Sequence, residues 1–225
     1  VRAEKSDAIP KIFIRNIDTN DEEELIVSKE PVGSPGVSLI QKNTNTTKIR
    51  ISWDSLSTPG KIYEYDIVTK EKKIVKEIEV PSGHNPDDYF VERIKATASD
   101  GRKIPITLVR RKDTKLDGKS KLLLYAYGCY KHSVPVSFSA SKFCLVDRGI
   151  IFGIAHVRGG GELGEKWYLE GKLLNKKNTF TDYISVCEHL IKNNYTYKGG
   201  LAFYGGSAGG TTGGAVINMN PDLFF

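Results

Sequence analysis

The ten residues LAFYGGSAGG, at positions 201–210, decide the class of fold. They begin with a short apolar run, Leu201 to Tyr204, of the kind that forms a buried strand. The pattern G-x-S-x-G follows directly, with Ser207 at its centre, and small residues come after it. A serine nucleophile stands on such a sharp strand-to-helix turn, and the flanking glycines leave room for the turn to pack. We therefore expect Ser207 to be a nucleophile and the Ala208 N–H to stabilise an oxyanion. The alternative is an ordinary glycine-rich turn in which the serine caps the next helix.

Buried strands and helices alternate on the N-terminal side of this turn. Residues 121–127 and 150–157 are continuous apolar runs, which are typical of strands covered on both faces. Residues 137–147 are compatible with a helix, and residues 179–193 show a clear 3.6-residue apolar stripe with Thr179 as the expected N-cap. This order predicts an α/β fold, with a mostly parallel sheet and helices on both of its faces.

The chain changes character near residue 88. Before it, short strand-like runs recur about every ten residues, separated by turn residues and without helices. These runs are residues 11–17, 24–28, 48–53, 61–67 and 73–80. They predict an antiparallel meander, as found in four-stranded propeller blades and also in pieces of sandwiches. We therefore expect two domains, residues 1–88 and 89–225.

The composition argues against some classes of binding partner. Lys and Arg number 33 against 27 Asp and Glu, a net charge of +6, and the charges are interleaved rather than gathered in a basic stripe. Nucleic acid is therefore not an expected partner. No apolar run approaches the roughly 18 residues that cross a bilayer, the N-terminus has no apolar signal region, and three widely spaced cysteines do not form a disulfide framework. We expect a cytoplasmic protein with no membrane partner.

A second glycine motif, GGGELG at residues 159–164, satisfies the dinucleotide pattern G-x-G-x-x-G and follows a strand. The helix that should follow is broken at Gly171, and no strand comes at the spacing of a βαβ unit. A tight loop is the preferred interpretation, with a nucleotide-dependent enzyme as the weaker alternative. Among the four histidines, no pair has metal-ligand spacing, and His156 is expected to be a hydrogen-bonded core residue. We therefore expect no cofactor and no metal.

Five segments together resemble one family, the prolyl oligopeptidase family of serine peptidases, and look closest to its oligopeptidase B (protease II) branch. They are YAYGCY at 125–130, IAHVRGGGELG at 154–164, KKNTFTD at 176–182, GGSAGG at 205–210 and NPDLF at 220–224. Shorter similarities, SLSTP at 55–59 and DDY at 87–89, extend the resemblance into the meander.

The resemblance implies the last blades of a β-propeller over residues 1–88 and the front part of an α/β-hydrolase domain over residues 89–225. It also implies hydrolysis of short peptides, in this branch after Arg or Lys. Ser207 would be the nucleophile, the Tyr127 hydroxyl and the Ala208 amide would form the oxyanion hole, and Tyr130 would lie near the substrate side chain.

Some positions depart from the family's pattern. Ala126 and Cys129 replace small family residues. Pro135 and Ser137 stand where oligopeptidase B enzymes often carry acids that bind a basic substrate, so the Arg/Lys preference is less firmly implied than the reaction.

Only 18 residues follow Ser207, whereas the α/β-hydrolase triad continues with Asp and then His. We therefore expect an incomplete chain with an open apolar sheet edge, poorly stable and inactive alone, that a complementary C-terminal polypeptide could restore. Two alternatives remain: an esterase-type acyl hydrolase on the same fold, and a non-catalytic remnant of a split or decayed peptidase gene.

Overall fold

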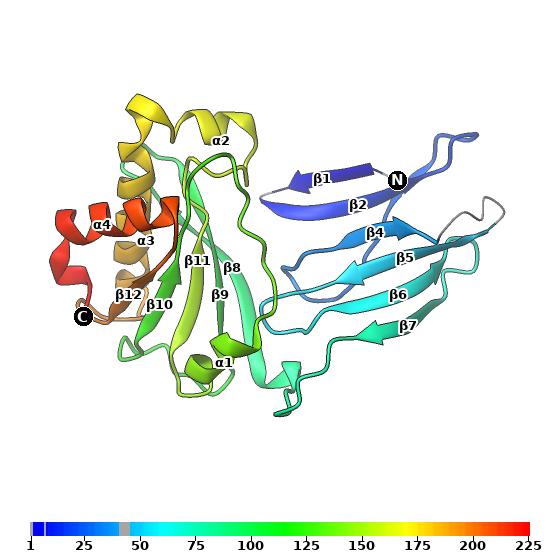
Figure 1. Cartoon of the computed structure of the whole chain (residues 1–225), viewed down its shortest axis with the longest axis horizontal. Coiled ribbons are helices and arrows are strands. Elements are labelled where there is room, and N and C mark those ends of the chain that lie inside the picture. Colours follow the sequence, from blue (N-terminus) through cyan, green and yellow to red (C-terminus); the bar gives the residue numbers. More distant parts are fainter. Residues whose placement is uncertain (1, 7, 41–45) are drawn as a thin grey trace. The chain divides into compact units, whose positions relative to one another are not determined.

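The computed structural model describes residues 2–6, 8–40 and 46–225, which form two compact units (Figure 1). One unit is Val1–Pro86 with Pro135–Ser139, and the other is Asp87–Val134 with Ala140–Phe225. The change in sequence character near residue 88 lies close to this division.

The first unit consists of two antiparallel sheets. The three-stranded sheet has the order β1-β2-β3, and the four-stranded sheet is the meander β4-β5-β6-β7. The strands are β1 (Arg2–Ser6), β2 (Ile9–Arg15), β3 (Glu22–Glu24), β4 (Gly36–Leu39), β5 (Lys48–Trp53), β6 (Lys61–Asp66) and β7 (Lys72–Glu77). The four-stranded meander has the form of a propeller blade. The strand predicted at residues 24–28 is wrong. The observed strand, β3, ends at Glu24, so the two ranges share only that residue.

Alternation along β5 builds the core of this unit. Ile49, Ile51 and Trp53 point inward and join a buried cluster, as the two-residue period of a strand requires. The segment just after β5 contributes three hydroxyl groups, and all of them donate to the half-buried carboxylate of Glu30. The donors are Ser55 (2.5 Å), Ser57 (3.2 Å) and Thr58, and the Trp53 indole also donates to this carboxylate at 3.4 Å. The polar segment at 55–59 is therefore buried around one acceptor, which satisfies its hydroxyls.

The second unit contains a five-stranded mixed sheet of order β12-β10-β11-β9-β8. Its strands are β8 (Tyr89–Thr97), β9 (Lys103–Arg111), β10 (Leu122–Tyr125), β11 (Ile151–Ala155) and β12 (Leu201–Tyr204). The strands β10, β11 and β12 are parallel, whereas β9 is antiparallel to both β8 and β11. The strands that alternate with helices are therefore parallel, as predicted, and both antiparallel pairings involve β9. The reason is the tight turn at 98–102, which returns β9 beside β8 before the βα alternation begins.

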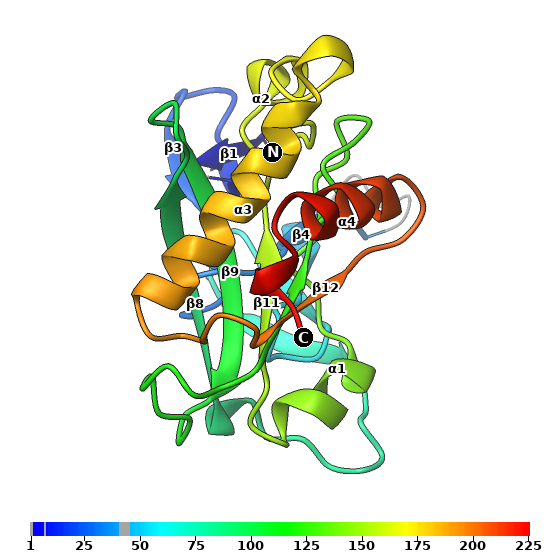
Figure 2. The same cartoon turned by 90° about the vertical axis from the view of Figure 1, so that its left-hand side faces the viewer.

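Helices cover both faces of this sheet. They are α1 (Ala140–Val146), α2 (Glu165–Leu169), α3 (Lys177–Lys192) and α4 (Ala208–Met219), with short 3-10 turns at Pro86–Asp88, Leu173–Asn175 and Pro221–Leu223. The helices α3 and α4 lie side by side (Figure 2) and share a buried cluster with Ile151 of β11. The next residue, Phe152, points to the other face, where Lys142 of α1 lies over its ring.

One helix boundary differs from the prediction. The helix α3 begins at Lys177, with Lys176 at the N-cap position, so Thr179 is not its N-cap. The Thr179 hydroxyl instead donates a hydrogen bond to the Arg158 carbonyl at 2.7 Å. The Thr179 side chain therefore makes a tertiary hydrogen bond, and not the local capping bond that the sequence pattern predicted.

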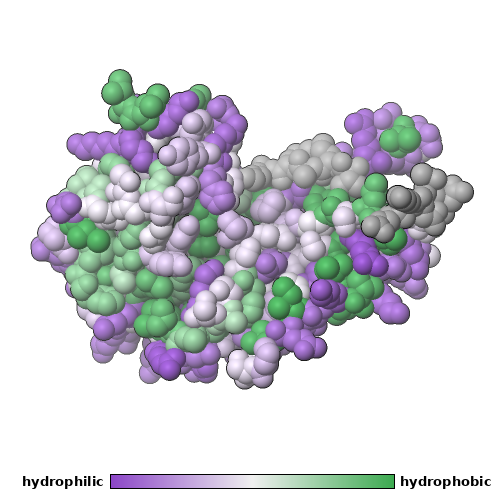
Figure 3. Space-filling model, in the orientation of Figure 1, coloured by the Kyte–Doolittle hydropathy of each residue, from purple (hydrophilic) through white to green (hydrophobic). Residues whose placement is uncertain are grey.

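The strand β12 lies at the edge of the sheet. Among the described residues it pairs with β10 and otherwise makes only a single bridge, between Leu201 and Phe224. Figure 3 shows apolar surface over α4, and the large apolar side chains exposed in this region are Tyr204, Ile217, Met219 and Phe225. In the described ranges, no helix has both the length and the apolar character needed to cross a membrane.

The three cysteines are all free thiols. They differ in surroundings: Cys144 is exposed, Cys129 is half-buried and Cys187 is fully buried in α3. Burial raises the pKa of the Cys187 thiol, because the thiolate would be desolvated there.

Candidate active site

Ser207 occupies the turn between β12 and α4 in a strained backbone conformation. Its φ of 53° and ψ of −127° lie in a region that residues with a Cβ rarely adopt, at a cost of about 1–3 kcal/mol. The residue is exposed, and its side chain does not cap α4. The alternative from the sequence, in which the serine side chain caps the next helix, is therefore wrong.

Two glycines make this turn possible. A Cβ on Gly205 would come within 2.7 Å of the Phe203 ring and 2.9 Å of the Ala126 carbonyl oxygen. A Cβ on Gly209 would lie 3.0 Å from the same oxygen. By contrast, a Cβ on Gly206 would meet nothing within 4 Å. We call the turn at residues 205–209 the elbow. Gly205 and Gly209 are needed because the elbow packs closely against the end of β10, whereas Gly206 has room for a side chain.

Because Gly205 is crowded and Gly206 is not, alanine at these two positions should affect stability to very different extents. We expect Gly205→Ala to lower the free energy of unfolding by about 1–3 kcal/mol, because backbone and ring atoms must move to admit the methyl group. Gly206→Ala should change it by less than about 0.5 kcal/mol, since its methyl group enters open space. Urea denaturation of the two variants beside the parent measures both. Equal destabilisation by the two substitutions would contradict this account of the elbow.

Tyr127 lies beside the elbow because β10 and β12 are adjacent and parallel. The paired residues Tyr125 and Tyr204 end these strands at the same edge of the sheet, and Tyr127 and Ser207 come two and three residues later. The Thr212 hydroxyl of α4 donates to the Tyr127 carbonyl at 3.2 Å, which ties the two segments together. Ala208 is the first residue of α4, so its N–H has no acceptor within the helix. Tyr127 and the free N–H at the start of α4 thus lie close to the exposed serine in the chain's fold.

The loop that carries Tyr127 is itself strained. Tyr130 (φ 56°) and Lys131 (φ 58°) are consecutive non-glycine residues in the left-handed region. Such strain persists only where the surroundings hold it, and it gathers at functional sites. Tyr130 is 77% exposed.

The glycine-rich loop after β11 supports this strained loop. A Cβ on Gly159 would lie 2.0 Å from the Gly128 oxygen, and a Cβ on Gly161 would lie 2.3 Å from the Lys131 oxygen. The Lys131 N–H donates to the Gly159 carbonyl at 3.1 Å. These glycines therefore serve backbone-to-backbone packing. The helix after them, α2, has only five residues, which also argues against the nucleotide-binding interpretation.

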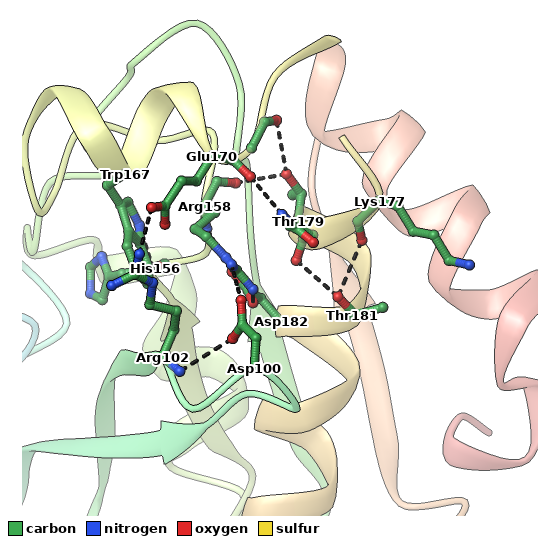
Figure 4. Close-up of polar contacts among 12 residues, drawn as sticks. Asp100, Arg102, His156, Arg158, Trp167, Glu170, Lys177, Thr179, Thr181 and Asp182 are labelled. Atoms are coloured by element: carbon green, nitrogen blue, oxygen red, sulfur yellow. Dashed lines mark hydrogen bonds and ion pairs between the residues drawn. The ribbon is translucent and has the colours of Figure 1, made fainter. Parts of the chain in front are cut away.

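A buried ion pair anchors the glycine loop to α3 (Figure 4). Arg158 donates to Asp182 from its backbone N–H (3.0 Å), from Nε (2.9 Å) and from Nη2 (2.5 Å), and both side chains are almost fully buried. Its Nη1 donates to Asp100 at 2.5 Å. Burial raises the pKa of the Asp182 carboxyl in spite of these bonds, and so Asp182 depends on Arg158 to remain ionised.

His156 lies deeper in the same loop and is a core residue. It is 1% exposed, its Nε2 lies 2.8 Å from the Thr107 hydroxyl, and its Nδ1 lies 3.5 Å from Glu162 Oε1. Although burial acts in the opposite direction, the bond to His156 holds the pKa of the Glu162 carboxyl below its usual value. The expectation of a hydrogen-bonded core histidine is met. In the part of the chain that the structure describes, no group of three or more His, Cys, Asp or Glu could hold a metal ion.

A pocket of about 350 Å³ opens beside the elbow. Tyr130, Cys129 and Ala208 line it together with two residues that the sequence analysis did not single out for chemistry, Lys172 and Lys176. The signal that could have found them is the basic stretch that follows Gly171 in the sequence.

Pro135 and Ser137 do not belong to this pocket. They lie in the segment Pro135–Ser139 of the first unit, which is bound through the Val136 carbonyl to Ser34 and through the Phe138 N–H to Asp54.

The profile of the prolyl oligopeptidase family matches residues 136–225, and that of the prolyl oligopeptidase N-terminal beta-propeller domain matches residues 1–78. The chain belongs to the prolyl oligopeptidase family. Residues 1–78 accordingly match the family's propeller domain, and residues 136–225 match its peptidase sequence.

Relatives of this prolyl oligopeptidase-family chain include several peptidases. Dipeptidyl aminopeptidase BI of Pseudoxanthomonas mexicana is 42% identical over the whole chain, which covers 31% of that protein. Protease 2 of Moraxella lacunata is 37% identical over 87% of the chain and 28% of its own length. The solved oligopeptidase B from Trypanosoma brucei superposes with a TM-score of 0.88 at 37% identity, over 99% of this chain and 32% of that one. The chain thus spans about a third of the length of its relatives.

Proposed function

We propose that the protein is a serine peptidase that hydrolyses short peptides, with Ser207 as the nucleophile. The observation that carries this proposal is the exposed Ser207, held at a φ of 53° at the start of α4 and beside Tyr127. The Tyr127 hydroxyl and the Ala208 N–H would donate to the oxyanion of the tetrahedral intermediate. Tyr130, at the rim of the adjacent pocket, would contact a substrate side chain.

The general base and its acid partner are proposed to come from polypeptide outside these 225 residues. The α/β-hydrolase order places them after the nucleophile, and the Ser207 side chain has no hydrogen-bond partner among the described residues. Prolyl oligopeptidase B of Galerina marginata, a structural neighbour, has been solved as three separate variants, in which alanine replaces a serine, an aspartate or a histidine, residues that follow one another in that order along its chain. A complementary C-terminal polypeptide that supplies both groups would activate Ser207, and the 225-residue chain alone would be inactive.

Cleavage after Arg or Lys is the finer part of the proposal. It is supported by the 37% identity to oligopeptidase B, a protein that has been solved with antipain covalently bound. Among the residues that the structure describes, no Asp or Glu lines the pocket beside the turn at Ser207. The acid that pairs with a substrate Arg or Lys would therefore lie outside this pocket.

Covalent labelling tests the proposal. A fluorophosphonate probe, applied to the full-length polypeptide of the natural gene, should attach to Ser207, as mapped by mass spectrometry of the tryptic peptides. The same probe should leave the isolated 225-residue chain unlabelled, because no base activates its serine. An adduct at another residue, or none in the full-length protein, would refute the assignment. Hydrolysis of simple esters but of no peptide would favour the esterase alternative.

The oxyanion role of Tyr127 gives a separate prediction. We expect Tyr127→Phe to lower kcat of the full-length enzyme by about 10²–10³-fold with little change in KM, because the lost hydrogen bond forms mainly in the transition state. Tyr125→Phe is the matched control, since Tyr125 lies two residues earlier, at the end of β10, and is not assigned to the oxyanion hole. Steady-state kinetics on a fluorogenic peptide measures both variants. A rise in KM alone would contradict the role.

A further inference from the structure

The pocket beside the elbow has an unbalanced positive charge. Lys172 and Lys176 both line it, and its described lining contains no Asp or Glu. Within the described residues, neither ammonium group lies within ion-pair distance of a carboxylate. The nearest acids along the chain are already engaged: Glu170 with Arg102 and Lys166, and Asp182 with Arg158.

The two lysines contribute in different ways. Lys176 directs its Nζ to neutral acceptors: the Gly128 carbonyl (2.5 Å), the Cys129 sulfur (3.0 Å) and the Thr179 hydroxyl (3.2 Å). These contacts hold its charge against the wall of the pocket. The Nζ of Lys172 lies 4.6 Å from the centre of the Tyr168 ring and makes no hydrogen bond within the described part of the chain, so its donors are available.

We propose that this pocket binds a carboxylate of the peptide substrate, with Lys172 as the residue that contacts it. The carboxylate is either the free C-terminus of a short peptide or an Asp or Glu side chain. The proposal rests on the peptidase function proposed above, because Ala208, which follows the nucleophile, lines the same pocket. A half-buried ammonium that lacks a counter-ion gains most from an anionic partner, since a charge-assisted hydrogen bond is about twice as strong as a neutral one.

A binding experiment tests this independently of catalysis. Fluorescein-labelled peptides of one sequence, ending in a free carboxylate or in an amide, are titrated into the full-length Ser207→Ala protein and followed by anisotropy. A second pair of peptide amides differs only by Asp or Asn near the cleavage site. At least one acidic peptide should bind about tenfold more tightly than its neutral counterpart, and the pair that shows the difference identifies the source of the carboxylate.

Two variants locate the effect. In Lys172→Met the preference for the acidic peptide should fall below about twofold, whereas Lys177→Met, which removes an exposed neighbouring lysine outside the pocket, should keep it. The preference should also weaken as salt is raised from 0.05 to 0.5 M. Equal affinities within both peptide pairs, or a preference that survives in Lys172→Met, would overturn the inference. Failure of the fluorophosphonate experiment would refute the peptidase function instead, and the two failures are therefore distinguishable.

Discussion

Replacing Ser207 by alanine is expected to lower kcat of the full-length enzyme by about 10⁵–10⁶-fold. The nucleophile and its base act as a unit, so removal of the hydroxyl leaves only the oxyanion hole and substrate binding. The strained turn makes this effect specific to Ser207, because no other serine among the described residues has a positive φ. Hydrolysis of a fluorogenic peptide, together with loss of fluorophosphonate labelling, measures it.

Two further variants separate chemistry from folding. Ser207→Gly should abolish activity equally and yet raise the free energy of unfolding by about 1 kcal/mol, because glycine adopts a φ of 53° without steric conflict. Ser82→Ala, at an exposed serine of the first unit, should leave both properties unchanged. An active Ser207→Gly enzyme would show that another residue is the nucleophile.

Replacing Arg158 by methionine is expected to reduce the stability of the second unit by about 3–5 kcal/mol. The substitution leaves the carboxylate of Asp182 buried without a counter-charge, which is far more destabilising than loss of a surface ion pair. Amide hydrogen exchange of α3 measures the stability of this unit within the full-length protein. Protection factors of its peptides should fall by roughly a hundred- to several-thousand-fold, at 1.4 kcal/mol for each factor of ten.

The controls for this prediction come from the same network. Arg102→Met removes a partly exposed pair with Glu170 and should change protection by less than about threefold. The double variant Arg158→Met with Asp182→Leu should recover part of the loss, since an apolar pair replaces the stranded charge. A single variant Arg158→Met with protection close to the parent would contradict the anchoring role of this pair. Because Arg158 precedes the glycines that support the Tyr127 loop, the single variant should also react more slowly with the fluorophosphonate.

Local sequence was sufficient to predict those strands and turns that an apolar run or a pair of glycines marks. The stretch at 201–210 predicted both the strand Leu201–Tyr204 and the turn at Ser207, because an apolar run and two closely spaced glycines leave the backbone few alternatives. The apolar runs near 121 and 150 likewise predicted β10 and β11. The antiparallel pairing of β9 with β11 joins segments that are far apart in the sequence, and no local pattern predicted it.

The sequence by itself determined the strand and the turn that carry Ser207. It also predicted chemical roles for Ser207, Ala208 and Tyr127. Only the tertiary structure decided their environment. It paired Arg158 with Asp182 across 24 residues, took Thr179 from the expected cap, and set Lys172 and Lys176 beside Ala208 without a counter-charge. The physical reason is that a nucleophile elbow is a local backbone conformation, which neighbouring residues specify. Burial and electrostatic pairing depend instead on which distant segments meet in the fold.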